Sequence, residues 1–333
     1  MIDRVAWPVP AGRARGYTRP EKLVSVLQNM GAVDRGCAYV AHGRGRGGLG
    51  GRLEQWVPSR QLQPPQTSTA ILSPIFLTKA SAWAAWVDLY DDWSISPNTN
   101  PYYRLLARGG YRAVRDMAEQ ARLVTVNTTY MANLLAPVAT VQIPNGVDAA
   151  LADIPSLGSS EPRLILLGEF FPGRTDFKTI LEVALRPEFS EIVICAPGTS
   201  KQMAGVIRVL RSQLGARLQV HRWLGSTELG QVIGERTVVL VPHIVCDYTL
   251  SQDLLKVYQF LALGARIICP RMLWPEKVER TYGLLLDRGV DLGEVLSDWL
   301  ESAPPTTVWR RQFVNRHSWD YRGEMLVRAM GLR

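Results

Sequence analysis

The sequence predicts an α/β protein of two domains, and three observations support this. The chain has 333 residues, which is too long for one compact core and fits two domains of ordinary size. Short apolar segments alternate with amphipathic ones along most of the chain, as in parallel sheets covered by helices. A small and polar segment, 148–161, separates two such regions. We therefore expect two Rossmann-like domains that face each other across a cleft.

The first domain is expected to span 1–150. Its apolar segments and turn residues predict the following strands and helices: strands at 69–73, 84–90, 123–126 and 140–143, a helix at 101–121, and a second helix that begins after 127–129 and runs to Leu135. The last strand ends at Pro144-Asn145-Gly146, a strong breaker of regular structure.

The second domain is expected to span 161–317 and to repeat the alternation more regularly. Its predicted strands are Arg163–Leu167, Glu191–Cys195, Leu218–Arg222, Thr237–Val241 and Arg266–Cys269. Its predicted helices cover about 176–185, 200–214, 227–233 and 252–263. Five strands with helices between them predict a doubly wound sheet. A last helix, at about 318–333, is expected to return to the first domain.

Net charge is the one compositional departure from an ordinary globular protein. The chain carries +8, of which residues 1–150 hold +6, from 16 Lys and Arg against 10 Asp and Glu. Such a basic region fits nucleic acid, an anionic membrane surface or an anionic substrate, and composition does not choose among them. Four scattered cysteines and isolated histidines give no metal-ligand spacing, so we expect no bound metal. No apolar run has the length of a membrane span, and we expect a cytoplasmic protein.

The most informative segment is 223–270. An apolar strand ends at Pro242, a loop follows over 243–249, and a helix is predicted to open at 251–253. A helix N-terminus at the carboxyl edge of a parallel sheet favours a phosphate group. Lys256 and Gln259 share one face near that end, so they fit a diphosphate and a ribose, respectively.

This segment resembles the donor-binding segment of GT-B glycosyltransferases. The likeness lies in a strand, Pro, a loop, and then S-x-x-x-x-K-x-x-Q-F-L-A-L-G, read from Ser251 to Gly264. Three more segments are similar in order and spacing: Ile143–Asp148 (IPNGVD), Leu166–Phe171 (LLGEFF) with Arg174-Thr175-Asp176, and Trp86–Trp93 (WVDLYDDW). The resemblance covers about residues 84–320, and it implies two domains that bind a nucleotide sugar and an acceptor.

The sequence departs from the retaining members of this superfamily at two positions. Those enzymes carry two glutamates, whereas Ser251 and Gln259 occupy the corresponding places here. A Lys-x-x-Gln pattern before a strand that ends Cys-Pro is similar to the xanthan-type glucuronosyltransferases, which invert the anomeric centre. The resemblance therefore implies an inverting transfer.

An inverting transfer needs a carboxylate that takes the proton of the attacking hydroxyl. Asp91 and Asp92 follow an apolar strand, so either is a candidate base, and the alternative is that they cap the next turn. Asp88 is as well explained by a structural role.

The remaining candidate residues are assigned to the donor. Arg174 and Lys256 are expected to neutralise the diphosphate, with Tyr248, Thr249 and Ser251 lining its pocket. The residues expected near the nucleoside are Gln259, Pro197, Gly198, Trp223 and Leu224. For each, ordinary surface or turn chemistry is the alternative. The four histidines are expected to have surface or core roles.

The sequence thus predicts a metal-independent glycosyltransferase that uses a nucleotide-diphosphate sugar, a UDP-sugar by preference, without a further cofactor. The acceptor is expected to be a glycan, a lipid-linked molecule or a small molecule, and the pathway polysaccharide, glycolipid or natural-product biosynthesis. The basic first half suggests peripheral contact with an anionic membrane, at its inner face, and nucleic acid is not expected. The alternative is an inactive homologue that binds a nucleotide and serves as a scaffold or partner subunit.

Overall fold

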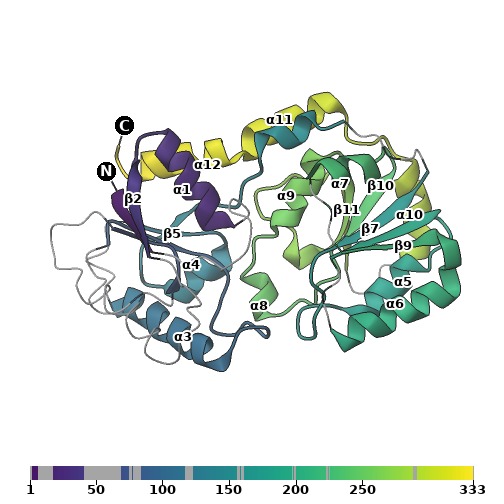
Figure 1. Cartoon of the computed structure of the whole chain (residues 1–333), viewed down its shortest axis with the longest axis horizontal. Helices are drawn as coiled ribbons and strands as arrows, with labels where there is room; N and C mark the ends of the chain where they lie inside the picture. Colours follow the sequence, from purple (N-terminus) through teal and green to yellow (C-terminus); the bar gives the residue numbers. More distant parts are fainter. Residues whose placement is uncertain are drawn as a thin grey trace. The chain divides into compact units, whose positions relative to one another are not determined.

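The computed structural model describes residues 2–6, 18–40, 69–74, 77, 84–116, 123–155, 158, 161–196, 198, 200–222, 224, 226–287 and 291–332. The chain forms two compact units, and each is built on its own parallel sheet (Figure 1). Unit 1 comprises Met1–Asn145, Ser251–Asp253 and Trp319–Arg333, and unit 2 comprises Gly146–Leu250 and Leu254–Ser318. The predicted α/β class is confirmed.

Within the described residues, the sheet of unit 1 has six strands in the order β2-β1-β3-β4-β5-β6, all parallel. The strands are β1 (Ile2–Ala6), β2 (Val33–Val40), β3 (Thr69–Ile71), β4 (Trp86–Leu89), β5 (Val124–Val126) and β6 (Val141–Gln142). The helices are α1 (Arg19–Asn29), α3 (Pro101–Asp116), α4 (Thr129–Leu135) and α12 (Trp319–Ala329).

The central strands of unit 1 are mostly apolar because both of their faces are covered. Every residue of β4 and β5 is buried. The predicted cap after β5 is confirmed, since the Thr128 hydroxyl accepts a hydrogen bond from the Met131 amide at 3.2 Å. Strands β1 and β2 were not predicted. They extend the sheet on the side of β3 that faces away from β4.

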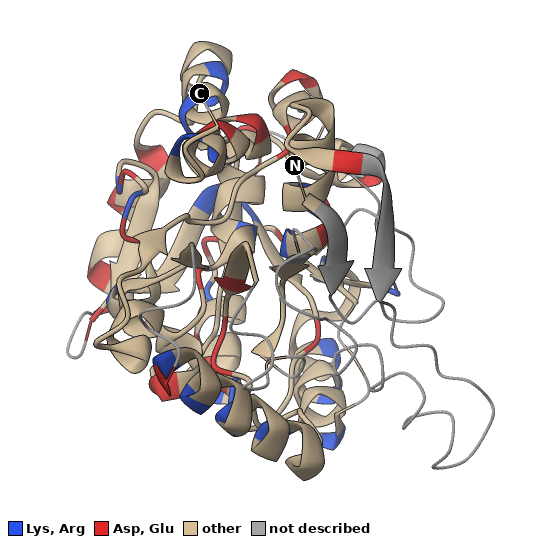
Figure 2. Cartoon of the chain, turned by 90° about the vertical axis from the view of Figure 1, so that its left-hand side faces the viewer, with Lys and Arg blue, Asp and Glu red and all other residues tan. Residues whose placement is uncertain are grey.

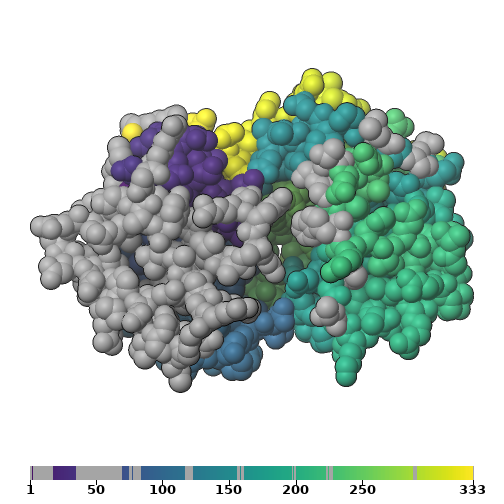
Figure 3. Space-filling view, viewed as in Figure 1, coloured from purple at the N-terminus to yellow at the C-terminus, as the bar shows by residue number. Residues whose placement is uncertain are grey.

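The two ends of the chain meet in unit 1. Helix α12 packs on α1, and a Cβ atom at Gly323 would lie 2.3 Å from the Val26 side chain. In Figures 1 and 3 the yellow residues of α12 lie beside the purple residues of α1. Only glycine allows so close an approach of the two helices. Helices α1 and α12 therefore belong to the same unit, although they lie at opposite ends of the sequence.

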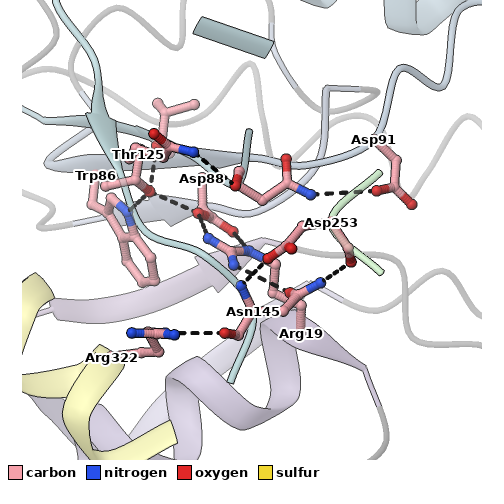
Figure 4. A network of polar contacts seen from close by, with 11 residues as sticks. Arg19, Trp86, Asp88, Asp91, Thr125, Asn145, Asp253 and Arg322 are labelled. Carbon is pink, nitrogen blue, oxygen red and sulfur yellow. Dashed lines mark hydrogen bonds and ion pairs between the residues drawn. The ribbon is translucent and has the colours of Figure 1, made fainter. Parts of the chain in front are cut away.

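A buried ion pair fixes α1 to the sheet of unit 1 (Figure 4). The Arg19 guanidinium makes two hydrogen bonds to the Asp88 carboxylate, Nε to Oδ2 at 2.9 Å and Nη2 to Oδ1 at 2.8 Å. The Thr125 hydroxyl also donates to Asp88, at 2.7 Å, and the Trp86 indole donates to Thr125 at 2.8 Å. Asp88 is therefore a structural residue, whose charge is satisfied on all sides.

Residues 251–253 belong to unit 1 although their neighbours in sequence belong to unit 2. The backbone amide of Asn145 donates to the Asp253 carboxylate, and the Asn145 side chain donates to the Asp253 carbonyl oxygen. Arg322 donates to the Asn145 carbonyl oxygen at 3.0 Å, and Arg19 donates to the Asn145 side-chain oxygen at 3.3 Å (Figure 4). Asn145 thus joins three segments that are distant in sequence.

In the described residues, unit 2 also has a six-stranded parallel sheet, in the order β12-β11-β10-β7-β8-β9. Its strands are β7 (Arg163–Leu167), β8 (Glu191–Cys195), β9 (Leu218–His221), β10 (Thr237–Leu240), β11 (Arg266–Pro270) and β12 (Gly283–Leu286). Its α-helices are α5 (Phe177–Ala184), α6 (Lys201–Leu214), α7 (Ser226–Val232), α8 (Asp247–Leu250), α9 (Leu255–Ala262), α10 (Leu292–Glu301) and α11 (Thr307–His317). Short 3-10 helices are η3 (Ala149–Asp153), η4 (Gly215–Arg217) and η5 (Arg271–Leu273).

The five predicted strands of the second domain are confirmed, and β12 is a sixth that the sequence did not suggest. The predicted start of helix α9, at 251–253, is wrong. The helix begins at Leu255, and residues 251–253 are not helical. The loop predicted at 243–249 instead contains most of the short helix α8. The physical reason is that residues 251–253 make their hydrogen bonds within unit 1. The predicted C-terminal glycine of α9 is confirmed, since Gly264 has φ +92°.

Candidate functional site

Lys256 lies in the first turn of α9 and reaches the carboxyl end of β7. Its Nζ donates to the carbonyl oxygen of Leu167, the last residue of that strand. Gly168 has φ +113°, and a Cβ atom there would lie 2.5 Å from the lysine Nζ. Only glycine both adopts this backbone conformation and leaves room for the ammonium group. The glycine in the turn after β7 therefore provides the space that the Lys256 ammonium group occupies.

Arg174 and His243 are brought together by backbone pairing of their two loops. The Asp176 amide donates to the Pro242 carbonyl oxygen at 2.8 Å, and the Ile244 amide donates to the Arg174 carbonyl oxygen at 2.8 Å. Thr175 and His243 also form an antiparallel bridge. The loop that follows β7 and the loop that follows β10 thus form one edge of unit 2.

Two buried nitrogen atoms at this edge have no hydrogen-bond acceptor among the described residues, namely Nε of Arg174 and Nδ1 of His243. A buried polar atom without a partner costs about 1–3 kcal/mol, so such atoms point to a ligand or a bound water. Both nitrogens can donate to an oxygen of an anion, His243 when Nδ1 is protonated.

Three basic side chains lie at this edge, and burial and mutual proximity lower the pKa values of two of them. Burial, together with the nearby Arg174 charge, lowers the pKa of Lys256 to about 7. Burial lowers the pKa of His243 well below its usual value, and the positive charges of Arg174 and Lys256 lower it further. A phosphate group would favour the charged forms of all three groups. We call Arg174, His243 and Lys256 the basic cluster.

The other residues predicted for the donor have mixed placements. The Thr249 hydroxyl is buried and makes hydrogen bonds within its own turn, to the Ile244 carbonyl oxygen at 2.5 Å and from the Cys246 amide at 3.0 Å. Tyr248 is half-buried in α8, and Gln259 is half-buried one turn after Lys256 in α9.

Ser251 belongs to unit 1, whereas the residues of the basic cluster belong to unit 2. Its side chain is fully buried, and its hydroxyl accepts a hydrogen bond from the Asp92 amide at 2.7 Å. Gly198, with φ +75°, follows β8 and lies against Glu169, while Leu224 is half-buried after β9. Pro197 and Trp223 lie outside the described residues.

Asp91 is placed by a turn directly after β4 of unit 1. Its φ is +54°, an uncommon conformation for a residue other than glycine and one that occurs often at functional sites. The turn is held by Tyr111 of α3, whose hydroxyl donates to the Asp91 carbonyl oxygen at 2.9 Å and accepts from the Trp93 amide at 3.1 Å. Asp91 is half-buried, whereas Asp92 beside it is buried.

The neighbouring Asp92 has a different environment. It is buried, and its Oδ1 accepts hydrogen bonds from the Ser94 amide at 2.9 Å and the Ser94 hydroxyl at 2.6 Å. This is the turn-capping role that the sequence left open as an alternative. Of the two predicted carboxylates, Asp91 therefore remains the candidate base.

Two amide side chains hold the Asp91 carboxylate. Asn127 Nδ2 donates to Oδ1 at 3.4 Å, and Gln252 Nε2 donates to Oδ2 at 3.2 Å. The carbonyl oxygens of both amides are buried and have no donor among the described residues. Hydrogen bonds from amide donors favour the ionised carboxylate, which is the form that a general base requires.

Sequence reasoning missed three residues of these sites, namely His243, Asn127 and Gln252. His243 follows a Pro at the end of a predicted strand, so its place at the sheet edge could have been inferred. Asn127 was assigned only to the start of a helix. Gln252 is 161 residues from Asp91 in sequence, and no local signal relates the two.

The chain has the GT-B fold, the fold of glycosyltransferases built from two Rossmann-like domains. It is similar to sucrose-phosphate synthase (tll1590) from Thermosynechococcus elongatus, with a TM-score of 0.65, 15% identity, and 99% of this chain and 98% of that chain covered. It is similar to the lipopolysaccharide outer core galactosyltransferase WaaB, with a TM-score of 0.65, 10% identity and 99% of each chain covered. It is also similar to Anabaena HepE (Alr3699), solved in complex with UDP and glucose, with a TM-score of 0.61, 14% identity, and 99% of this chain and 100% of that chain covered.

No protein-family profile and no curated protein sequence matches the chain. Among the described residues, none of the helices has the length and apolar character needed to cross a membrane. The same residues contain no group of three or more His, Cys, Asp or Glu side chains arranged to hold a metal ion.

Proposed function

We propose that the protein is a glycosyltransferase that moves a sugar from a UDP-sugar to a hydroxyl group of an acceptor. The observation that carries this proposal is the basic cluster, with its two unsatisfied buried nitrogens at the carboxyl edge of the unit 2 sheet. Edges of this kind are where ligands bind in open α/β sheets. The similarity to HepE, solved with UDP and glucose, supports a uridine nucleotide as the ligand.

The proposed reaction assigns one part to each unit. In unit 2, Arg174 and Lys256 bind the diphosphate and stabilise the negative charge that develops as the bond from the anomeric carbon to the diphosphate oxygen breaks. In unit 1, Asp91 takes the proton of the acceptor hydroxyl. The oxygen of that hydroxyl forms the new bond to the anomeric carbon. UDP leaves with the bonding electron pair.

Inversion and metal independence are part of the proposal. A single displacement with Asp91 as base inverts the anomeric centre, and the absence of glutamates at Ser251 and Gln259 supports a mechanism different from that of the retaining enzymes. Two protein cations on the leaving diphosphate can supply the charge that a divalent ion supplies elsewhere. The acceptor class is a glycan, a lipid-linked molecule or a small molecule.

The first test is ligand binding, measured as the thermal shift of the protein with UDP, GDP, TDP and ADP. We expect the largest stabilisation with UDP, and a loss of that shift in Lys256→Met. Lys201→Met is the matched control, because Lys201 is exposed at the start of α6. Equal shifts in both variants would contradict the assignment of Lys256.

The second test is turnover of UDP-sugars, with and without sugar acceptors, and the anomeric configuration of the product by proton NMR. A protein that binds UDP but turns over no donor would support the alternative of an inactive scaffold. A product with retained configuration would remove Asp91 from the role of base.

A further inference from the structure

Helix α3 has one buried face and one strongly basic face. Its buried residues are Ala107, Gly110, Tyr111, Ala113 and Val114, which lie on one side of the helix at 100° per residue. A Cβ atom at Gly110 would lie 1.9 Å from the carbonyl oxygen of Pro74, so the helix backbone sits directly against that segment. The inner face is therefore firmly attached to unit 1, and the opposite face is directed to the surface.

The outer face carries a row of arginines. Arg108, Arg112 and Arg115 are exposed, and Arg104 is half-buried one turn earlier. Spacings of four, four and three residues place them on one side of the helix. Figure 2 shows these blue segments recurring along α3, with a single red segment at its end. Among the described residues, no carboxylate forms an ion pair with any of the four.

Two large side chains lie exposed in the first turns of the same helix. Leu105 is 65% exposed and Tyr102 is 54% exposed. A single exposed apolar residue is ordinary, but here an aliphatic and an aromatic side chain adjoin a row of arginines. This combination is typical of helices that lie in a membrane interface, where arginines contact lipid phosphates and apolar side chains enter the acyl boundary.

We infer that the outer face of α3, formed by Tyr102, Leu105, Arg108, Arg112 and Arg115, docks on a membrane surface that contains anionic lipids. Charge complementarity selects this partner, because three exposed arginines of this face form no ion pair within the described residues. The exposed Leu105 favours lipid over nucleic acid, since a phosphate backbone offers no apolar phase for an aliphatic side chain. This inference goes beyond the transfer reaction and does not depend on it.

Docking at this face would also affect the reaction. The inner face of α3 contributes Tyr111, which holds the turn of the candidate base Asp91 at 2.9 Å. One rigid helix therefore carries the docking residues outside and the support of the base inside. An acceptor held in a membrane would be presented to the unit that carries the base.

The experiment is sedimentation of the full chain with vesicles of phosphatidylcholine and phosphatidylglycerol, and with vesicles of phosphatidylcholine alone. The test variant is Arg108→Gln/Arg112→Gln. The matched control is Arg208→Gln/Arg211→Gln, which removes two exposed arginines from α6 of unit 2 and changes the net charge equally. Leu105→Ser tests the apolar contribution.

We expect the wild type and the α6 control to bind the anionic vesicles and to be released by high salt. The α3 double variant should bind about tenfold or more weakly, since each surface arginine contributes roughly fivefold. Leu105→Ser should weaken binding without changing its salt dependence. Failure of the wild type to bind, or equal losses in the two double variants, would overturn the inference. Binding of single-stranded RNA but not of vesicles would overturn it too.

Discussion

Adjacent carboxylates that look alike in sequence have different roles in the structure. Asp92 is enclosed by its own turn, where it accepts two hydrogen bonds from Ser94. Asp91 is half-buried, and two amide side chains donate hydrogen bonds to its carboxylate, one to each oxygen. The positive φ angle of Asp91 directs the two neighbouring side chains into different environments. One of them is a structural residue and the other is a candidate base.

We expect Asp91→Asn and Asp92→Ala to affect different quantities. Asp91→Asn should lower kcat by about 10²–10⁴, the usual contribution of general base catalysis, with little change in the melting temperature. Asp92→Ala should lower the free energy of unfolding by about 1–3 kcal/mol, because the buried Ser94 amide loses its acceptor. Steady-state kinetics and thermal unfolding of both variants check this, and a reversed pattern would make Asp92 the base.

The basic cluster should make UDP affinity depend on pH. The pKa of Lys256 is lowered to about 7 by burial and by Arg174, so the lysine is largely neutral at pH 8 to 9 in the free protein. A bound diphosphate favours the charged form and raises this pKa, so binding takes up a proton. The dissociation constant should therefore increase as pH rises above about 7, at most tenfold per pH unit for one proton.

This dependence can be measured by calorimetric titration of UDP between pH 7.5 and 9 in buffers of different ionisation enthalpy. Proton uptake should appear in the wild type, whereas any weak UDP binding that Lys256→Met retains should proceed without it. An affinity that is independent of pH in the wild type would show that another group neutralises the diphosphate.

At the scale of elements, one helix shows how backbone contact decides what a residue does. Gly109 and Gly110 are neighbours in α3, and helix propensity treats them alike. A Cβ atom at Gly109 would meet nothing within 4 Å, whereas one at Gly110 would overlap the Pro74 carbonyl group. The position of α3, and with it the support of Asp91 by Tyr111, depends on this close approach.

Alanine at these two positions should therefore have effects of opposite sign. Gly109→Ala should raise the free energy of unfolding by up to about 1 kcal/mol through helix propensity. Gly110→Ala should lower it by about 1–3 kcal/mol, because the helix has to move away from Pro74. Chemical denaturation of both variants measures the difference, and equal stabilisation would show that the segment at Pro74 yields at little cost.

For the whole molecule, the division into units does not follow the sequence in one simple cut. Unit 1 takes 251–253 and the last fifteen residues from the second half of the chain. Asp253 holds the Asn145 backbone, and Arg322 of the last helix holds the same residue from its carbonyl oxygen. The chain passes from unit 1 to unit 2 directly after Asn145 and again directly after Asp253. These two residues are hydrogen-bonded to each other, so one buried network holds both boundaries.

Loss of this network should destabilise unit 1 more than loss of a nearby surface charge. Asp253→Ala should lower the free energy of unfolding by about 1–3 kcal/mol, because it leaves the buried Asn145 amide without an acceptor. Asp247→Ala, at an exposed position of α8 in unit 2, should have an effect within about 0.5 kcal/mol. Calorimetric unfolding of the two variants compares them, and similar melting curves would contradict this role of Asp253.

Periodicity and breakers predicted most of the fold, since buried parallel strands are short apolar runs that end in turn residues. Both sheets lie where those runs lie, apart from β1, β2 and β12, which the sequence did not suggest. The start of α9 was predicted three to four residues too early, because residues 251–253 make tertiary hydrogen bonds in place of helical ones.

The sequence by itself determined the α/β class, most strands of both sheets, and the positions of Asp91, Arg174 and Lys256 after apolar strands or in the first turn of a helix. These are local properties, which the spacing of apolar residues and turn residues encodes. Only the tertiary structure decided that Asp92 is structural, that His243 joins Arg174 and Lys256, and that Gln252 contacts Asp91 from 161 residues away. Those roles arise from distances between residues that are remote along the chain, and no local pattern records such distances.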